Sequence, residues 1–243
     1  MLGPMFIPFD IFQLLSSLEV ARHIYLRKSI YGISLDFALY SWVWAGTHAL
    51  ANSLYTFLPT IHSQYAARYP LFPGIPFSMS LTFLSLLQFC VCTVIARKCF
   101  YGLKTQEKLS VVCKTVLGCS FSVLMWFFWL YCHGRATINA LDLADCLHNI
   151  GSIAMASRLI PQASLNWFLD TFVLSRTFLL LQLFSVASGS FALLSAYLGG
   201  TKWYELPISL PSQAVLATTW CALAVLVVQW KIYGSSVIFP LNR

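Results

Sequence analysis

Acidic and amide side chains recur in a largely apolar stretch between residues 139 and 149. Those that share one helical face, at spacings of three and four residues, are Asn139, Asp142, Asp145 or Cys146, and Asn149. Carboxylates in an apolar helix are costly and usually face a cavity or a partner, and His148 is of a type that titrates near pH 6.5. Either Asp142, Asp145 and His148 relay protons from a water-facing vestibule, or the carboxylates lie among lipid headgroups and the imidazole only reaches toward them.

Four further residues that can do chemistry are Arg158, Pro161, Gln162 and Asn166. Pro161 lacks an N–H and opposes the carbonyl four residues earlier, so it predicts a kink that can serve as a hinge, unless it simply ends the helix. Gln162 and Asn166 are one helical turn apart and share a face. An asparagine in this position either binds a polar solute or forms an interhelical hydrogen bond.

Lys28 and Asp36 form a third candidate pair, at the expected end of one helix and the start of the next. Opposite charges placed in this way can form an ion pair that holds the cytosolic side of the protein closed. They are equally compatible with a helix N-cap at Asp36 and a topology-setting charge at Lys28.

The elements that carry these residues are predicted to be membrane helices. Hydrophobic residues make up 58% of the 243 positions and charged residues 9%, with a mean hydropathy of +0.74, which is too little charge for a soluble surface. The apolar runs do not alternate and are about 20 residues long, enough to cross a hydrocarbon core of about 30 Å as helices. The predicted spans are residues 5–25, 37–58, 75–96, 110–131, 140–160, 177–198 and 212–233.

The basic residues predict the orientation of these spans. Of the fifteen Lys and Arg residues, only Arg68, Arg135 and Lys202 fall in even-numbered connections. The positive-inside rule therefore places the odd-numbered connections and the C-terminus in the cytosol and the N-terminus in the lumen. Since topology explains the net charge of +7, the lipid bilayer is an expected partner and nucleic acid is not.

Seven helices with their two ends on opposite faces are typical of parallel repeats. We predict a first three-helix repeat over residues 1–100, a linker helix over 101–135, and a second three-helix repeat over 136–243. Each triplet has a first helix interrupted by polar residues, a basic connection and a more apolar second helix.

Three stretches carry a family resemblance. Residues 28–37 read K-S-I-Y-G-I-S-L-D-F, residues 158–166 read R-L-I-P-Q-A-S-L-N, and residues 188–194 read S-G-S-F-A-L-L. In this order they resemble the PQ-loop repeat membrane proteins, especially the cystinosin-like branch. The resemblance extends over most of the chain in architecture and about a fifth of it in motif.

The resemblance implies a transporter in a vacuolar or lysosomal membrane that exports cystine or a similar small amino-acid solute to the cytosol, with proton coupling left open. It implies Pro161 as the hinge. The implied substrate-binding residues are Asn166, Gln162, Arg158, Asp36 and Lys28.

The chain also departs from that branch. Glu19-Val20 stands in place of the first Pro-Gln, and the usual acids of the third and sixth helices fall on Ser78 or Ser80 and on Ser185. Gly151 occupies the place of a basic residue. The alternative function is therefore a non-transporting protein of the same fold, acting as a partner or chaperone in the endomembrane pathway. No HExxH or GxSxG motif is present, so we expect neither an enzyme nor a bound cofactor or metal.

Overall fold

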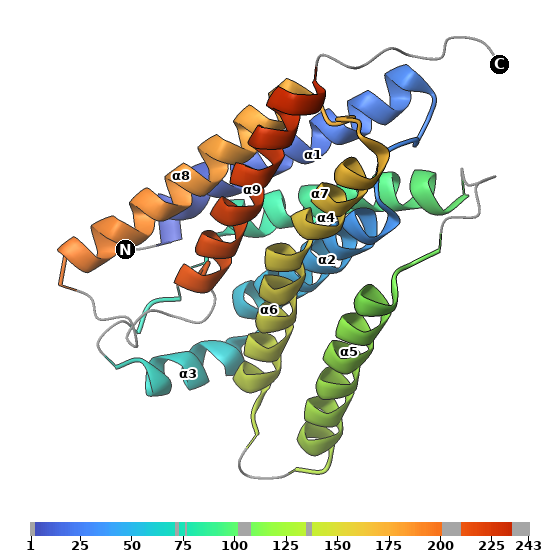
Figure 1. Ribbon diagram of the computed structural model, residues 1–243. Helices are drawn as coiled ribbons and strands as arrows, with labels where there is room; N and C mark the ends of the chain where they lie inside the picture. Colours follow the sequence, from blue (N-terminus) through green and yellow to red (C-terminus); the bar gives the residue numbers. More distant parts are fainter. Residues whose placement is uncertain are drawn as a thin grey trace.

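The computed structural model describes residues 3–70, 73–75, 77–101, 108–134, 138–200 and 210–234, and all regular structure in these ranges is helical. A short 3-10 helix, η1 (Gly3–Phe6), precedes the α-helices. These are α1 (Ile7–Arg27), α2 (Leu35–Phe57), α3 (Pro59–Arg68), α4 (Met79–Tyr101), α5 (Val111–Cys132), α6 (Ala140–Ser157), α7 (Leu159–Leu169), α8 (Arg176–Leu198) and α9 (Gln213–Tyr233) (Figure 1). The predicted all-helical class is confirmed.

Four of these helices, α4, α5, α8 and α9, are long and apolar enough to cross a membrane. The other long helices, α1, α2 and α6, correspond to predicted spans but carry polar residues that point into the protein. These buried polar residues include Gln13, Ser16 and Glu19 on α1, Asp36, Ser41 and Asn52 on α2, and Asp145 and His148 on α6. Their polarity therefore reflects a polar interior.

Two features differ from the predicted spans. The span predicted to end at residue 160 is divided into α6 and α7, with Arg158 between them, and it continues to Leu169. The helix α3 is an additional element, which lies between the predicted spans 37–58 and 75–96. Pro59 occupies the first turn of α3, where a missing N–H costs nothing. Arg135 and Lys202, used in the orientation prediction, lie outside the described residues.

Serine side chains start four of the helices. Ser34, Ser110, Ser175 and Ser212 precede α2, α5, α8 and α9, and each accepts a hydrogen bond from the backbone N–H three residues later. In the α1–α2 connection Gly32 has a φ of +78°, and a Cβ there would lie 2.2 Å from Val173 Cγ2. Both the conformation and the close packing therefore require glycine.

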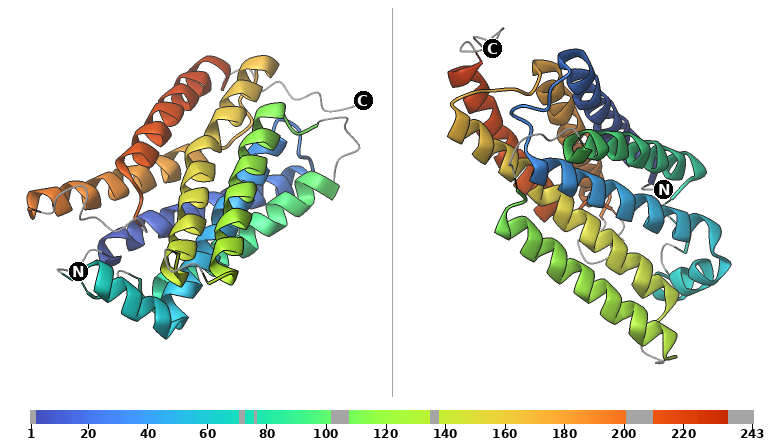
Figure 2. Two further views of the ribbon diagram at one scale, coloured as in Figure 1. Left: turned by 90° about the horizontal axis from the view of Figure 1, so that it is seen from below. Right: turned by 90° about the vertical axis from the view of Figure 1, so that its right-hand side faces the viewer.

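The helices pack in two similar groups. In the first, α4 contacts both α1 and α2; in the second, α9 contacts α8 and the α6–α7 pair. Between the groups, α1 packs against α8 and α2 packs against α6. The remaining long helix, α5, lies at the edge along α6 (Figure 2) and, of its described residues, buries only Cys113.

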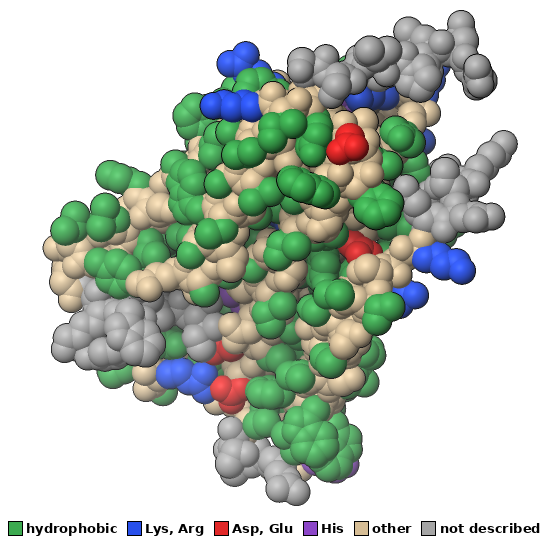
Figure 3. All heavy atoms as spheres, viewed as in Figure 1, with side chains coloured by type: hydrophobic (Ala, Val, Ile, Leu, Met, Phe, Trp, Pro, Cys, Tyr) green, Lys and Arg blue, Asp and Glu red, His purple; other side chains and the backbone are tan. Residues whose placement is uncertain are grey.

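The outer surface is suited to contact with lipid. On the face shown in Figure 3, apolar side chains cover most of the middle, and Lys and Arg lie at the margins. On α5 the exposed side chains include Phe121, Met125, Trp126 and Trp129. An apolar surface of this kind indicates a membrane-embedded protein.

Candidate functional site

A small buried cavity lies where α1, α2, α4 and α6 meet, next to Leu210 and Pro211 before α9. Its volume is about 40 Å³, room for roughly three water molecules. The polar and titratable residues that line it are Asp10, Gln13, Trp44, His48, Asn52, Ser85, Gln88 and His148. This concentration of polar side chains inside an apolar protein marks the cavity as the candidate site.

One face of α2 supplies three of these side chains. Trp44, His48 and Asn52 follow one another at four-residue spacing, so they form a line along the helix. The buried atoms Trp44 Nε1, His48 Nε2 and Asn52 Oδ1 have no hydrogen-bond partner among the described residues. Buried polar atoms are normally paired with protein, water or a ligand, so this line has unused capacity to bind a polar solute.

The facing helices add more unpaired atoms. On α6, His148 is 1% exposed and neither ring nitrogen has a partner in the described structure; on α4, Gln88 Oε1 has none. Gln88 Nε2 meanwhile donates to Ser17 Oγ on α1 over 2.6 Å. The cavity thus presents donors and acceptors from helices of both groups.

Arg158 lies next to this cavity, in contact with Gln13 and Trp44, which line it. It lies in the break between α6 and α7 and is 1% exposed. Its guanidinium carbon is 4.5 Å from the centroid of the Trp44 ring, a cation–π contact. In the described part of the chain no carboxylate lies within ion-pair distance of Arg158. A buried cation without an anionic partner is costly, so it creates a strong local preference for a negative group.

Amides hold the guanidinium in place. Arg158 Nη2 donates to Gln13 Oε1 and, over 3.0 Å, to Gln182 Oε1. Gln182 Nε2 in turn donates to Gln13 Oε1 over 3.2 Å and to Ser16 Oγ. Gln13 and Gln182 are 1% and 0% exposed, so this network joins α1, α8 and the α6–α7 break in the protein interior. Arg158 Nε is buried and makes no hydrogen bond within the described residues.

The predicted substrate residues Gln162 and Asn166 lie in a separate cluster. Gln162 Oε1 accepts from Ser34 N over 3.0 Å, and its Nε2 donates to Gly32 O over 2.8 Å and to Asn166 Oδ1 over 3.0 Å. Asn166 Nδ2 donates to Gln229 Oε1 over 3.3 Å. The oxygen and the nitrogen of both amides are therefore hydrogen-bonded, and these bonds join α7 to the α1–α2 connection and to α9.

Asp36 and Lys28 do not form an ion pair with each other in the described structure. Asp36 is buried and accepts from Ser110 N over 3.1 Å, which ties the start of α5 to α2. The N-cap of α2 is Ser34, not Asp36. Lys28 is exposed at the end of α1, with a φ of 51°. The predicted latch is not formed in this conformation.

Pro161 lies in the first turn of α7, directly after the break that holds Arg158. The predicted interruption of the helix is present, and it falls three residues before the proline because the ring excludes the carbonyl of the preceding turn. Pro161 and Asp36 line the same groove, of about 500 Å³, between α2, α5 and α7. The hinge role of Pro161 stays a prediction.

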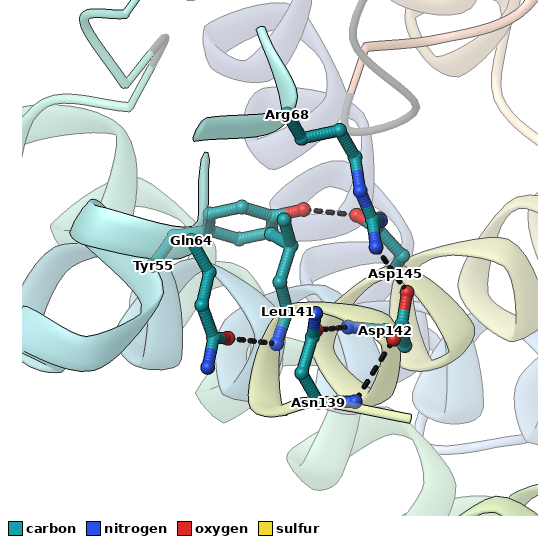
Figure 4. A network of polar contacts seen from close by, with 7 residues as sticks. All are labelled: Tyr55, Gln64, Arg68, Asn139, Leu141, Asp142 and Asp145. Atoms are coloured by element: carbon teal, nitrogen blue, oxygen red, sulfur yellow. Dashed lines mark hydrogen bonds and ion pairs between the residues drawn. The ribbon is translucent and has the colours of Figure 1, made fainter. Parts of the chain in front are cut away.

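Asp142 and Asp145 join α6 to α3 (Figure 4). Arg68 Nη2 donates to Asp142 Oδ1 over 2.5 Å, and Nη1 donates to Asp145 Oδ2 over 3.2 Å. Asp145 Oδ1 also accepts from the Tyr55 hydroxyl, and Asp142 caps α6 together with Asn139. Burial alone would lower the pKa of Arg68, but its hydrogen bond to Asp142 and the charges of both carboxylates raise that pKa above its usual value.

The three residues predicted to relay protons thus lie in two separate places. Asp142 and Asp145 line a groove of about 450 Å³ between α5 and α6, whereas His148 lines the interior cavity. The ring of His148 lies instead against His48, with centroids 4.2 Å apart. Both residues are buried, but spacing on one helix does not reveal the partners: Asp145 meets Tyr55 and Arg68, and His148 meets His48.

Several site residues were not predicted, chiefly Gln13, Trp44, His48, Gln88 and Gln182. Their signal in the sequence is the presence of polar side chains within otherwise apolar spans. The partner of each one depends on helix packing across the two groups, which no local pattern contains.

The fold and the cavity define a helical membrane protein with a polar interior. No protein-family model matches the chain. It is 26% identical over 211 residues to the uncharacterized protein YCL002C of Saccharomyces cerevisiae, covering 77% of this chain and 78% of that protein. It is 28% identical over 145 residues to cystinosin of Bos taurus, covering 58% of this chain and only 38% of cystinosin. The chain is thus weakly similar to cystinosin and spans well under half of its length.

Proposed function

We propose that this chain is a membrane transporter for a small amino-acid-like solute whose carboxylate binds at Arg158. The observation that carries the proposal is a buried guanidinium with no carboxylate partner in the described residues. It contacts Gln13 and Trp44, which line a cavity that also presents unpaired polar atoms. A solute carboxylate would neutralise this charge, and bidentate pairing with guanidinium is its strongest protein contact. Cystine is the first candidate because of the similarity to cystinosin.

The proposed architecture is seven spans in two parallel triplets. Residues 1–100 would contribute α1, α2 and α4, and residues 136–243 the α6–α7 pair, α8 and α9, with α5 in the 101–135 linker. The packing supports this: the last helix of each triplet contacts the other two, and the first helix of each contacts the second helix of the other. Equivalent contacts of this kind are expected from a two-fold relation between repeats.

Transport requires the cavity to enlarge. At about 40 Å³ it is much smaller than a typical small-molecule site, so the described conformation is closed around its polar residues. We propose that the break before Pro161 bends to open the cytosolic side. The Gln162 cluster, which ties α7 to Gly32 and Ser34, would be the contact that changes.

For localisation we propose a vacuolar or lysosomal membrane, with the N-terminus in the lumen and the C-terminus in the cytosol. The positions of the basic residues support the orientation, and the similarity to cystinosin supports the compartment. The solute would then leave the lumen for the cytosol.

The competing function is a non-transporting partner or chaperone of the same fold. The small cavity favours this alternative, because a structural protein needs no space for a solute. The Gln162 and Asn166 amides favour it as well, since both are hydrogen-bonded within the protein. Absence of any solute exchange by correctly folded protein would select this alternative.

Counterflow in proteoliposomes tests the proposal. Vesicles loaded with unlabelled cystine, or with another neutral amino acid, are assayed for uptake of the same labelled compound. We expect Arg158→Gln to reduce exchange at least tenfold, since it removes the cation but retains an amide. Arg176→Gln is the matched control, because Arg176 packs on Trp230 away from the cavity. Equal exchange by wild type and Arg158→Gln would refute the assigned role.

A further inference from the structure

The imidazoles of His48 on α2 and His148 on α6 lie against each other in the cavity, with their ring planes tilted. Their ring centroids are 4.2 Å apart and the ring planes are inclined by 37°. His148 Nδ1 and Nε2 and His48 Nε2 are buried without hydrogen-bond partners among the described residues. Imidazole is the side chain whose ordinary pKa is closest to neutral pH, so this pair is the part of the cavity best suited to take up and release a proton.

Gly151 makes the close approach possible. It follows His148 by three residues on α6, and a Cβ at this position would lie 2.4 Å from His48 Cδ2 and 2.6 Å from Thr47 Oγ1. Contacts that short cannot exist, so any larger residue would displace the His48 ring. The glycine thus creates the space into which the α2 imidazole fits.

The charges around the pair are few. Asp10 on α1 lines the same cavity. Asp145 precedes His148 by one turn, but it is bound to Tyr55 and to Arg68 of α3. Arg158 is separated from His48 by the Trp44 ring, which contacts both. The other helices near the pair add little charge. The residues with which α4 lines the cavity are uncharged, and α9 carries no charge between residues 213 and 230. On α5, Lys114 lies in the first turn.

We propose that His48 and His148 form one proton-binding site of the cavity, occupied by a single proton. Two charged rings 4.2 Å apart would repel, so the first proton opposes the second. The serine hydroxyls of the spans, such as those of Ser80 and Ser185, cannot exchange a proton near neutral pH. The use of this histidine site in transport rests on the proposed function, whereas its existence does not.

NMR of histidine-labelled protein in nanodiscs tests the site without any solute. The imidazole shifts are followed from about pH 8 to about pH 4.5, and single His→Gln variants assign each signal. We expect the pair to bind one proton in this range. We expect His148→Gln to move the titration midpoint of His48 by about one pH unit or more, and the reverse for His48→Gln.

Two further variants control for folding and for general effects. His133→Gln changes an exposed residue at the end of α5 and should leave the pair's titration unchanged. Gly151→Ala keeps both imidazoles but displaces His48, and should make the two rings titrate independently. The proposal is overturned if both rings take up a proton, if neither does, or if each midpoint is indifferent to loss of the other ring. Because no transport is measured, these outcomes are separate from failure of the proposed function.

Discussion

The guanidinium of Arg158 lies over the indole of Trp44, 4.5 Å from the ring centroid, although the two residues belong to different helix groups. The cation comes from the α6–α7 break, and the ring comes from the middle of α2. This contact links Arg158 to the line of polar residues on α2 (Trp44, His48 and Asn52). Any motion between the two helix groups must therefore change it.

Replacement of Trp44 should therefore weaken solute binding more than it weakens the fold. Trp44→Phe keeps an aromatic face but removes the unpaired Nε1–H, whereas Trp44→Leu removes the cation–π contact as well. We expect the KM for exchange to rise about threefold for Phe and about tenfold for Leu, which correspond to losses of about 0.7 and about 1.4 kcal/mol. Concentration-dependent uptake measures both. An unchanged KM in Trp44→Leu would exclude the indole from the site.

Gln162→Ala is expected to act on stability. The substitution leaves Gly32 O and Ser34 N without their buried partner, which costs about 1–3 kcal/mol. Thermal unfolding in detergent should show a clear loss of Tm. Gln229→Ala removes the bond from Asn166 and the bond to Ala163 O but leaves the α1–α2 connection untouched, so it measures the α7–α9 contact separately. Should Gln162→Ala keep the wild-type Tm and lose only solute binding, Gln162 would belong to the substrate site, as the family resemblance implies.

The Arg68 contacts with Asp142 and Asp145 are expected to be structural. Arg68→Gln and Asp145→Asn should each lower the free energy of unfolding, and the double variant should cost about 1 kcal/mol less than the sum. A double-mutant cycle at low and high salt measures this coupling. Because the pKa of Arg68 is raised, its cation persists at all physiological pH values, and its contribution is lost only as the pH rises through that pKa. Full additivity would show that the pair does not stabilise the fold.

The orientation can be checked with single cysteines in a cysteine-free background. Ser63 is exposed on α3, and Ser29 is exposed after α1. We expect Ser63→Cys to react with an impermeant reagent from the lumen and Ser29→Cys from the cytosol. Reaction of both from one face would contradict the proposed topology.

Much of the fold was predictable, for physical reasons. Long apolar runs specify helices in lipid, and Pro161 specifies an interruption whatever its surroundings. The helix α3 was missed because a proline-rich connection also permits a short helix that begins at Pro59.

The site was predicted less well. Arg158 was identified through its motif, but its amide and aromatic partners come from α1, α2 and α8. The role of His48 was not predictable, because it depends on the space left by the missing side chain of Gly151, roughly a hundred residues later in the chain. Helices that are apolar around most of their circumference give no clear signal of which face turns inward, and that rotation decides the composition of the cavity.

The most direct measurement is ligand-dependent thermal stabilisation of the purified protein by cystine and by its diamide, which lacks both carboxylates. If Arg158 binds a solute carboxylate, cystine should raise the Tm of the wild type and the diamide should not. The cystine effect should disappear in Arg158→Gln and persist in Arg176→Gln, with other neutral amino acids and their amides tested in the same way. Equal stabilisation by acid and amide, or stabilisation that survives in Arg158→Gln, would contradict carboxylate recognition at Arg158.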